Sequence, residues 1–160
     1  PLLCDPHDGV PNEIRQYKVG YAGRDTHPIR ERCNQVMSNL PDYNFAINLN
    51  HNHTKVFRDI LYNSVFALSP RGFGPASFRM YEAIQMQCVP IYVSDVMWLP
   101  FTNYFEGDIR APIDPQKVDD LLESGQYQSM IDYGQEIYNK HLTWDGCLNT
   151  IAQMVGNHVN

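Results

Sequence analysis

The sequence predicts an α/β fold: a Rossmann-like, doubly wound and mainly parallel sheet. Short apolar runs alternate with segments of ten or so residues whose apolar side chains recur at helical spacing, which is the pattern of βαβ units. The length of 160 residues suits one domain with its own core. Right-handed crossovers between parallel strands then place helices on both faces of the sheet.

The sequence predicts an irregular N-terminal segment, followed by alternating strands and helices. Residues 1–16, which contain three prolines and a glycine, predict an irregular segment or linker. Residues 17–160 predict the Rossmann-like domain. Thr26 with Pro28, and then Thr54, are typical of helix starts. Strands are expected over 17–23, 45–49, 65–69 and 89–94. Helices are expected over 26–39, 54–63 and 76–87.

The C-terminal part predicts helices. After Asp95 we expect an aromatic loop and a short edge strand. Asp114, as a cap, and Pro115, in the first turn, predict a helix that Gly125 ends. Two further helices are expected over 127–141 and 144–155. We find no internal repeat, low-complexity tract or second domain in the sequence.

Composition excludes several classes of function. A formal net charge of −6 argues against nucleic acid as a partner, because nucleic-acid binders usually present a basic face. No run approaches the roughly 20 apolar residues that span a bilayer, so we expect no membrane segment. The four widely spaced cysteines form no metal-ligand motif; we interpret Cys33 and Cys88 as buried apolar residues, with a disulfide as the alternative. His51 and His53 lack further ligands at metal-binding spacing, so we predict no metal.

The segment 69–95 predicts a binding site. It contains a strand end, a glycine-bearing turn, a helix and a second strand, and the carboxyl ends of parallel strands meet at one edge of the sheet. Backbone N–H groups at a helix N-terminus have no partners within the helix and bind anions readily. Here the N–H groups near Gly74 and Ser77, with the Ser77 hydroxyl, are predicted to meet a diphosphate. Arg71 precedes the helix, Arg79 lies in its first turn, and Glu82 follows one turn later.

Each charged residue has an alternative interpretation. Arg79 can offset charge on a departing diphosphate and Glu82, on the same helix face, can accept bonds from ribose hydroxyls. Alternatively the two form an ion pair, and the glycines serve only the turn. Arg24 either grips the pyrophosphate or is a solvated loop charge. Asp95 either touches the donor sugar or caps the following turn.

Residues 68–95, LSPRGFGPASFRMYEAIQMQCVPIYVSD, followed by WLPF, resemble the C-terminal, donor-binding domain of the exostosin-like glycosyltransferases (glycosyltransferase family 47). The resemblance extends loosely back to residues 19–32 and fades beyond about Arg110. It implies one half of a GT-B glycosyltransferase, with Arg79 and Glu82 as donor-binding residues and Ser77 beside the phosphates. One departure is Gln87, where the family usually has glycine; we expect it to affect the packing of the helix end rather than ligand contact.

The resemblance implies transfer of a sugar from a nucleoside diphosphate sugar (UDP or GDP) to a glycan hydroxyl, with inversion, without an essential metal and without a cofactor. It implies an acceptor-side domain, N-terminal in the same chain, which carries the unassigned catalytic base. The first residue, Pro1, is not Met, so we expect a piece of a longer protein. Family membership implies the Golgi lumen for a eukaryotic member and the cytoplasm otherwise.

Two other functions stay open. One is a non-catalytic module that binds a nucleotide sugar or a partner and supports an active transferase chain. The other is a flavodoxin-like phosphate-binding or receiver domain, which needs acidic residues at the end of the first strand. The sequence Gly23-Arg24-Asp25 fits that second alternative poorly.

Overall fold

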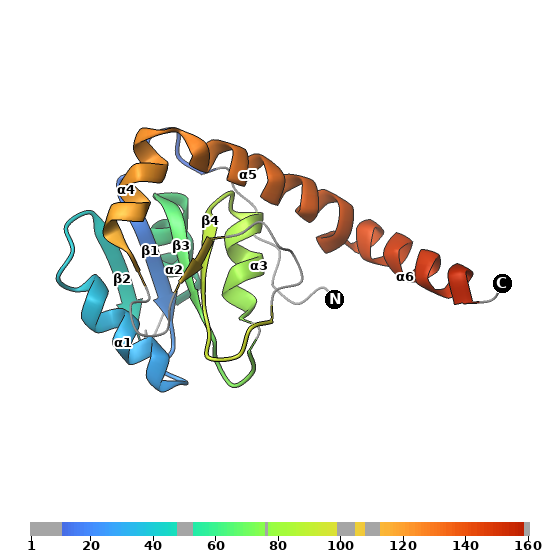
Figure 1. The fold of residues 1–160 in the computed structure, drawn as a ribbon, viewed down its shortest axis with the longest axis horizontal. Helices are drawn as coiled ribbons and strands as arrows, with labels where there is room; N and C mark the ends of the chain where they lie inside the picture. The colour runs from blue at the N-terminus through green and yellow to red at the C-terminus, as the bar shows by residue number, and fades with distance from the viewer. Residues whose placement is uncertain (1–10, 48–52, 76, 99–104, 108–112, 159–160) are drawn as a thin grey trace.

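The computed structural model describes residues 11–47, 53–75, 77–98, 105–107 and 113–158. Within these residues a five-stranded sheet has the order β2-β1-β3-β4-β5, and every neighbouring pair is parallel. Its strands are β1 (Tyr17–Gly23), β2 (Tyr43–Ile47), β3 (Ser64–Pro70), β4 (Val89–Val93) and β5 (Phe105–Gly107). The predicted α/β, Rossmann-like fold is confirmed (Figure 1).

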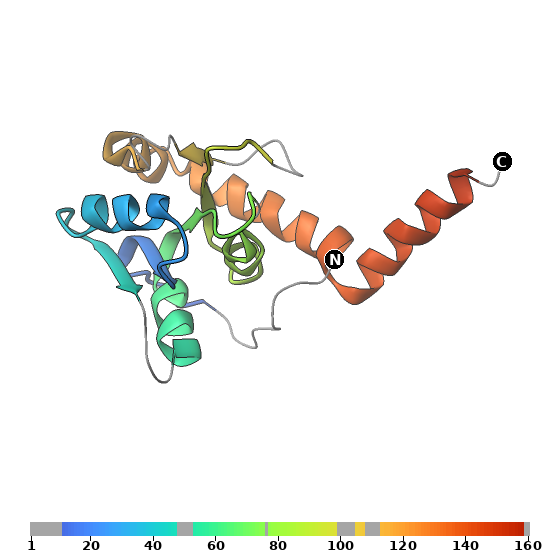
Figure 2. The ribbon, with the colours of Figure 1, turned by 90° about the horizontal axis from the view of Figure 1, so that it is seen from below.

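Helices cover both faces of the sheet (Figure 2). The helices are α1 (Pro28–Met37), α2 (His53–Tyr62), α3 (Phe78–Gln85), α4 (Pro115–Glu123), α5 (Gln126–Ile137) and α6 (Trp144–His158). One core cluster joins α1, α4 and α5 to the sheet, and a second joins α2 and α3 to its other face. The sheet is therefore doubly wound, as predicted.

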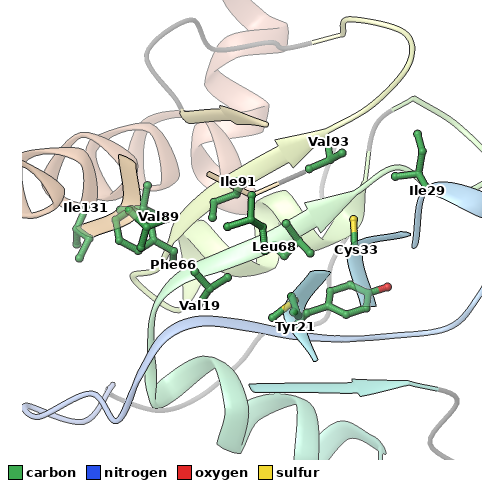
Figure 3. Packing of buried hydrophobic residues seen from close by; sticks show 13 residues of the cluster. Val19, Tyr21, Ile29, Cys33, Phe66, Leu68, Val89, Ile91, Val93 and Ile131 are labelled. Carbon is green, nitrogen blue, oxygen red and sulfur yellow. The ribbon is translucent and has the colours of Figure 1, made fainter. Parts of the chain in front are cut away.

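Alternation along the strands builds these two cores. Val19 and Tyr21 in β1 face the α1 side, whereas Ala22 faces the α2 side. Figure 3 shows the first cluster, in which Tyr21 lies near Cys33 of α1. Gly20 faces α2, where an added Cβ would lie 2.2 Å from Ser64 Oγ. Only glycine at this position lets β1, Ser64 and α2 approach so closely.

The helix boundaries differ from the sequence prediction at their caps. His27, not Thr26, is the N-cap of α1, because its backbone is extended and its Nδ1 accepts a hydrogen bond from Ile29 N at 3.3 Å. Thr54 lies inside α2, which begins at His53. Helix α3 begins at Phe78 and ends at Gln85, shorter than predicted at both ends.

Two expectations about helix ends are confirmed. Asp114 caps α4 by accepting hydrogen bonds from the backbone N–H groups of Gln116 and Lys117, with Pro115 in the first turn. Gln87 follows α3 with a φ of 57°, in the left-handed region that favours glycine. The departure from the family's glycine therefore falls at a helix end.

The C-terminal helices extend away from the sheet. Helix α5 continues through a π-helical turn, Tyr138–Leu142, into α6, which projects from the rest of the chain in both views (Figures 1 and 2). No helix in the described ranges is long and apolar enough to cross a membrane. Cys33, Cys88 and Cys147 are buried free thiols, whereas Cys4 lies outside the described residues.

Candidate functional site

The candidate site lies at the carboxyl ends of β1, β3 and β4. The chain leaves β1 to form β2 on one side of it and returns to form β3 on the other, so the strand order changes direction between β1 and β3. Parallel sheets bind ligands at such a switch point, beyond the carboxyl ends of the strands. Arg24, Arg71 and Asp95 follow β1, β3 and β4, so all three predicted residues belong to this edge.

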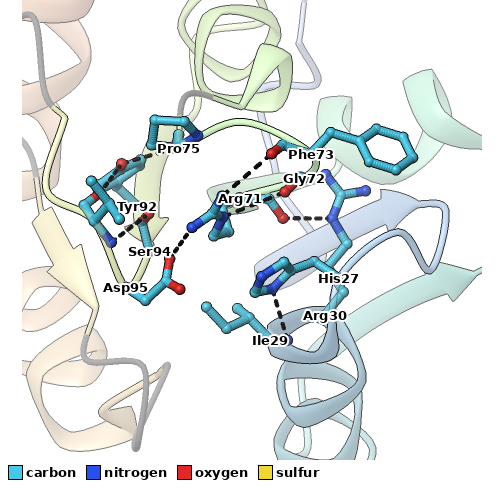
Figure 4. A network of polar contacts seen from close by, with 11 residues as sticks. His27, Ile29, Arg30, Arg71, Gly72, Phe73, Pro75, Tyr92, Ser94 and Asp95 are labelled. Atoms are coloured by element: carbon cyan, nitrogen blue, oxygen red, sulfur yellow. Dashed lines mark hydrogen bonds and ion pairs between the residues drawn. The ribbon is translucent and has the colours of Figure 1, made fainter.

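Arg71 and Asp95 form an ion pair across the ends of β3 and β4 (Figure 4). The Arg71 backbone N–H donates to Val93 O at 2.9 Å, which fixes the start of the loop. The hydrogen bond from Arg71 lowers the pKa of the Asp95 carboxyl, and the nearby His27 acts in the same direction. The cap of the following turn is Ser94, whose Oγ accepts from Val96 N at 3.2 Å. The Asp95 carboxylate itself pairs with Arg71, and its role towards a donor sugar stays a prediction.

Ser77 is the N-cap residue of α3, at the end of the loop that begins with Arg71. Its backbone is extended, but its side chain makes no capping hydrogen bond. The residue is only 3% exposed, and Oγ has no hydrogen-bond partner among the described residues. Buried hydroxyl groups are normally hydrogen-bonded, so an unpartnered one beside a helix N-terminus indicates a site for an anion.

Arg79 and Glu82 form an ion pair, as the structural alternative expects. Their side chains are 28% and 12% exposed, so the pair is partly buried rather than a solvated surface contact. The Arg79 guanidinium also lies 4.1 Å from the centroid of the Phe57 ring in α2, within the range of a cation–π interaction. These contacts hold Arg79 in one orientation in the first turn of α3.

Gly74 has open space around it. An added Cβ would have no heavy atom within 4 Å, and Gly74 is not among the residues with positive φ. Neither backbone conformation nor packing within the described residues therefore requires glycine there. Arg24 is exposed, and its carbonyl oxygen accepts a hydrogen bond from Arg30 Nη1 at 2.7 Å. Ligand roles for Gly74 and Arg24 stay predictions.

The charged residues form two groups rather than one. Arg71 pairs with Asp95, and Arg79 pairs with Glu82. The Tyr21 hydroxyl is also buried and has no hydrogen-bond partner among the described residues. Burial raises the pKa of Tyr21, and the positive charges of Arg30 and Arg79 oppose that rise. The spacing of Arg79 and Glu82 in the sequence predicted their contact, but nothing in the sequence predicted that Arg71 pairs separately with Asp95.

Two residues of the site were missed by sequence analysis. Arg30 is buried and bonds three backbone carbonyls at this edge of the sheet. The Tyr92 hydroxyl lies 2.9 Å from Pro75 O and 3.1 Å from Val96 O, which ties the loops after β3 and β4 together. Two features of the sequence could have identified them: Arg30 is an arginine beside the apolar face of α1, and Tyr92 is a tyrosine within an apolar strand.

Of the two histidines examined for metal binding, His51 lies outside the described residues, as does the side chain of His53. Among the side chains that the structure does describe, no group of three or more histidine, cysteine or acidic residues is arranged to hold a metal ion.

Comparison with known proteins identifies the family. The Exostosin GT47 domain model matches residues 6–111, more than half of the chain, and this range includes every strand of the sheet. Exostosin-1b of Danio rerio is 39% identical over 62 residues, which are 39% of this chain and 8% of that protein. The Exostosin-1 homolog of Caenorhabditis elegans is 30% identical over 107 residues, 64% of this chain and 27% of that protein.

The matched region thus spans between 8% and 27% of the length of these two relatives. The domain match also ends close to Arg110, where the resemblance was expected to fade. A domain model that covers the whole sheet, together with similarity to exostosin-1 proteins, leads to one conclusion. The chain belongs to the exostosin family of glycosyltransferases.

Proposed function

We propose that this domain binds the nucleotide-sugar donor of a glycosyltransferase. The reaction is transfer of a sugar from a UDP or GDP donor to a glycan hydroxyl, with inversion and without an essential metal. The observation that carries the proposal is the N-terminus of α3, where Ser77 Oγ is buried without a partner at the switch-point edge. A diphosphate supplies the acceptor oxygens that this hydroxyl and the adjacent N–H groups lack.

The proposed mechanism is stabilisation of the leaving diphosphate. As the glycosidic bond to the donor breaks, negative charge grows on the diphosphate oxygens. Fixed N–H groups and the guanidinium of Arg79 are placed before the reaction and therefore stabilise that charge without reorganising. Arg24 and Arg71 add positive charge on the β1 and β3 sides of the same edge. Glu82 accepts hydrogen bonds from the ribose, and the general base comes from the acceptor side.

Arg79→Ala tests this role of the guanidinium. A hydrogen bond to a charged group contributes about 1.5–3 kcal/mol, so the dissociation constant for the nucleoside diphosphate is expected to rise roughly 10- to 150-fold. The variant also loses the contacts to Glu82 and Phe57, which together contribute about 1–2 kcal/mol to stability. Calorimetric titration with UDP and GDP, with thermal unfolding alongside, measures both effects.

Lys140→Ala is the matched control, because it removes the same charge from an exposed position beyond α5. It is expected to leave affinity within about twofold, since exposed charges are screened over a Debye length. If Arg79→Ala stays folded and binds UDP and GDP as tightly as the parent chain, Arg79 is not a donor ligand.

We also propose that the domain works with an acceptor-side domain of the same protein, docked on α6. Trp144, Leu148, Ile151 and Val155 recur at spacings of four, three and four residues and so form one stripe of the helix. These side chains are between 57% and 71% exposed. The stripe lies beyond the matched exostosin region, on the helix that projects from the sheet. The matched relatives are several times longer than the shared segment, which supports a further domain as the occupant.

Leu148→Asn with Ile151→Asn, made in the longest natural form of the chain, tests this contact. Because both side chains are exposed in this domain, we expect the isolated domain to keep its stability and donor affinity. In the longer chain, transfer activity is expected to fall while donor binding is retained. Unchanged activity would remove α6 from the domain contact. Donor binding without transfer in the unmodified longer chain would instead favour the non-catalytic module.

A further inference from the structure

The guanidinium of Arg30 joins the ends of two strands at the candidate site. Nε donates to Arg71 O at 2.9 Å, Nη1 to Arg24 O at 2.7 Å and Nη2 to Pro70 O at 3.3 Å. Arg24 follows β1, whereas Pro70 and Arg71 end β3 and begin the next loop. One side chain therefore fixes the backbone on both sides of the switch point, as Figure 4 shows for its contact with Arg71.

The burial of Arg30 is costly for the fold alone. The residue is 8% exposed, and the ion pairs of the described residues do not include it. A buried charge is unfavourable unless it is paired, and carbonyl oxygens compensate a guanidinium less fully than a carboxylate does. A neutral apolar side chain would avoid the cost of burying the charge but would leave these three carbonyl oxygens without their donor. The fold thus keeps a positive charge buried at this edge, bonded to carbonyl oxygens rather than to a carboxylate.

The loop after β3 lies close against the guanidinium. A Cβ added to Gly72 would lie 3.0 Å from Arg30 Nη2 and 3.4 Å from Thr26 Oγ1. Glycine at position 72 thus lets the backbone that carries Arg71 rest on Arg30. The same backbone continues to Gly74 and Ser77, which belong to the proposed diphosphate site.

We propose that Arg30 is a positioning residue for the donor diphosphate. It locks the loops that carry Arg24 and Arg71 in one geometry, and its unneutralised charge adds a fixed positive potential beneath the anion. It contacts backbone carbonyls rather than the donor. This inference rests on the proposed function, because a positioning role requires a diphosphate at this edge.

The test compares Arg30→Met, which removes the charge and the hydrogen bonds, with Arg30→Lys, which keeps the charge but not the three-way fork. Affinity for UDP, GDP and inorganic pyrophosphate is measured by calorimetry at a temperature where each variant is folded. We expect Arg30→Met to weaken all three by about tenfold or more and Arg30→Lys to fall between it and the parent chain. Similar losses for pyrophosphate and nucleotides are expected because the effect is on the phosphates.

Met37→Ala is the matched control for stability. Met37 is buried at the other end of α1, so its truncation destabilises the same helix without touching the loops. We expect Met37→Ala to lower the unfolding temperature and leave affinity unchanged. If it weakens binding as much as Arg30→Met does, the Arg30 effect is only loss of stability and the proposal is overturned.

Hydrogen exchange reports the locking directly. The Arg71 amide donates to Val93 O, and we expect its exchange to become faster in Arg30→Lys while central amides of β3 keep their rates. If Arg30→Met does not fold, the affinities of Arg30→Lys and Gly72→Ala test the inference. A Cβ at position 72 would lie 3.0 Å from Arg30 Nη2, so the guanidinium would have to shift. Unchanged affinity in both overturns the inference and leaves the donor site standing. Absence of binding by the parent chain overturns the donor site and this inference with it.

Discussion

Ser77→Ala separates donor binding from folding more sharply than any other change at this site. The Ser77 hydroxyl is buried, and no described residue bonds to it. A buried polar group without a hydrogen bond costs about 1–3 kcal/mol, so its removal is expected to leave stability unchanged or to raise it slightly. Ser64→Ala is the mirror-image control. That serine is also fully buried, but its Oγ donates to Ile60 O at 2.6 Å.

The two serines therefore predict opposite outcomes. If Ser77 Oγ donates to a charged phosphate oxygen, its loss costs about 1.5–3 kcal/mol of binding, a rise in dissociation constant of roughly 10- to 150-fold. Ser64→Ala is expected to lower the free energy of unfolding by about 1 kcal/mol and to leave the dissociation constant unchanged.

Urea unfolding and calorimetric titration with UDP and GDP, run on both variants, measure the two quantities. The reasoning fails if Ser77→Ala loses stability while its affinity stays that of the parent chain. Ser77 would then have a structural role, and the N-terminus of α3 would lose the observation that marks it as an anion site.

Two further predictions concern Glu82 and the buried thiols. Glu82→Gln is expected to weaken UDP and GDP more than inorganic pyrophosphate, because only the nucleotides present ribose hydroxyls; equal losses in calorimetry would contradict the ribose role. Burial raises the pKa of Cys88 to about 11 and that of Cys33 to about 12, so both thiols stay protonated at pH 8. Iodoacetamide at pH 8 is therefore expected to spare both in the folded protein and to label both in urea, as followed by mass spectrometry. Between pH 9 and about 11 the Cys88 thiol keeps its proton in the folded state but ionises in the unfolded state. The free energy of unfolding therefore has its full contribution from Cys88 below pH 9 and loses it as pH rises from 9 towards 11. Labelling of folded Cys88 at pH 8 as fast as in urea would refute its burial.

Local patterns predicted the strands and helices well. The apolar runs that became β1, β3 and β4 were found within a residue or so of their observed ends, because a buried parallel strand must be apolar along its length. The Asp114 cap followed from side-chain chemistry alone. Thr26 failed as a cap because a neighbouring residue, His27, also offers an acceptor, and the backbone decides which of the two is used.

The fold class, the family and the i, i+3 contact between Arg79 and Glu82 could all be predicted from the sequence, since each depends on residues close together in the chain. The pairing of Arg71 with Asp95, 24 residues away, depends on how the strands are arranged in space, as does the contact of Arg30 with the ends of both β1 and β3. The order of the strands sets those contacts. Right-handed crossovers bring the carboxyl ends to one edge, but sheet order decides which loops meet there, and no local pattern specifies that order.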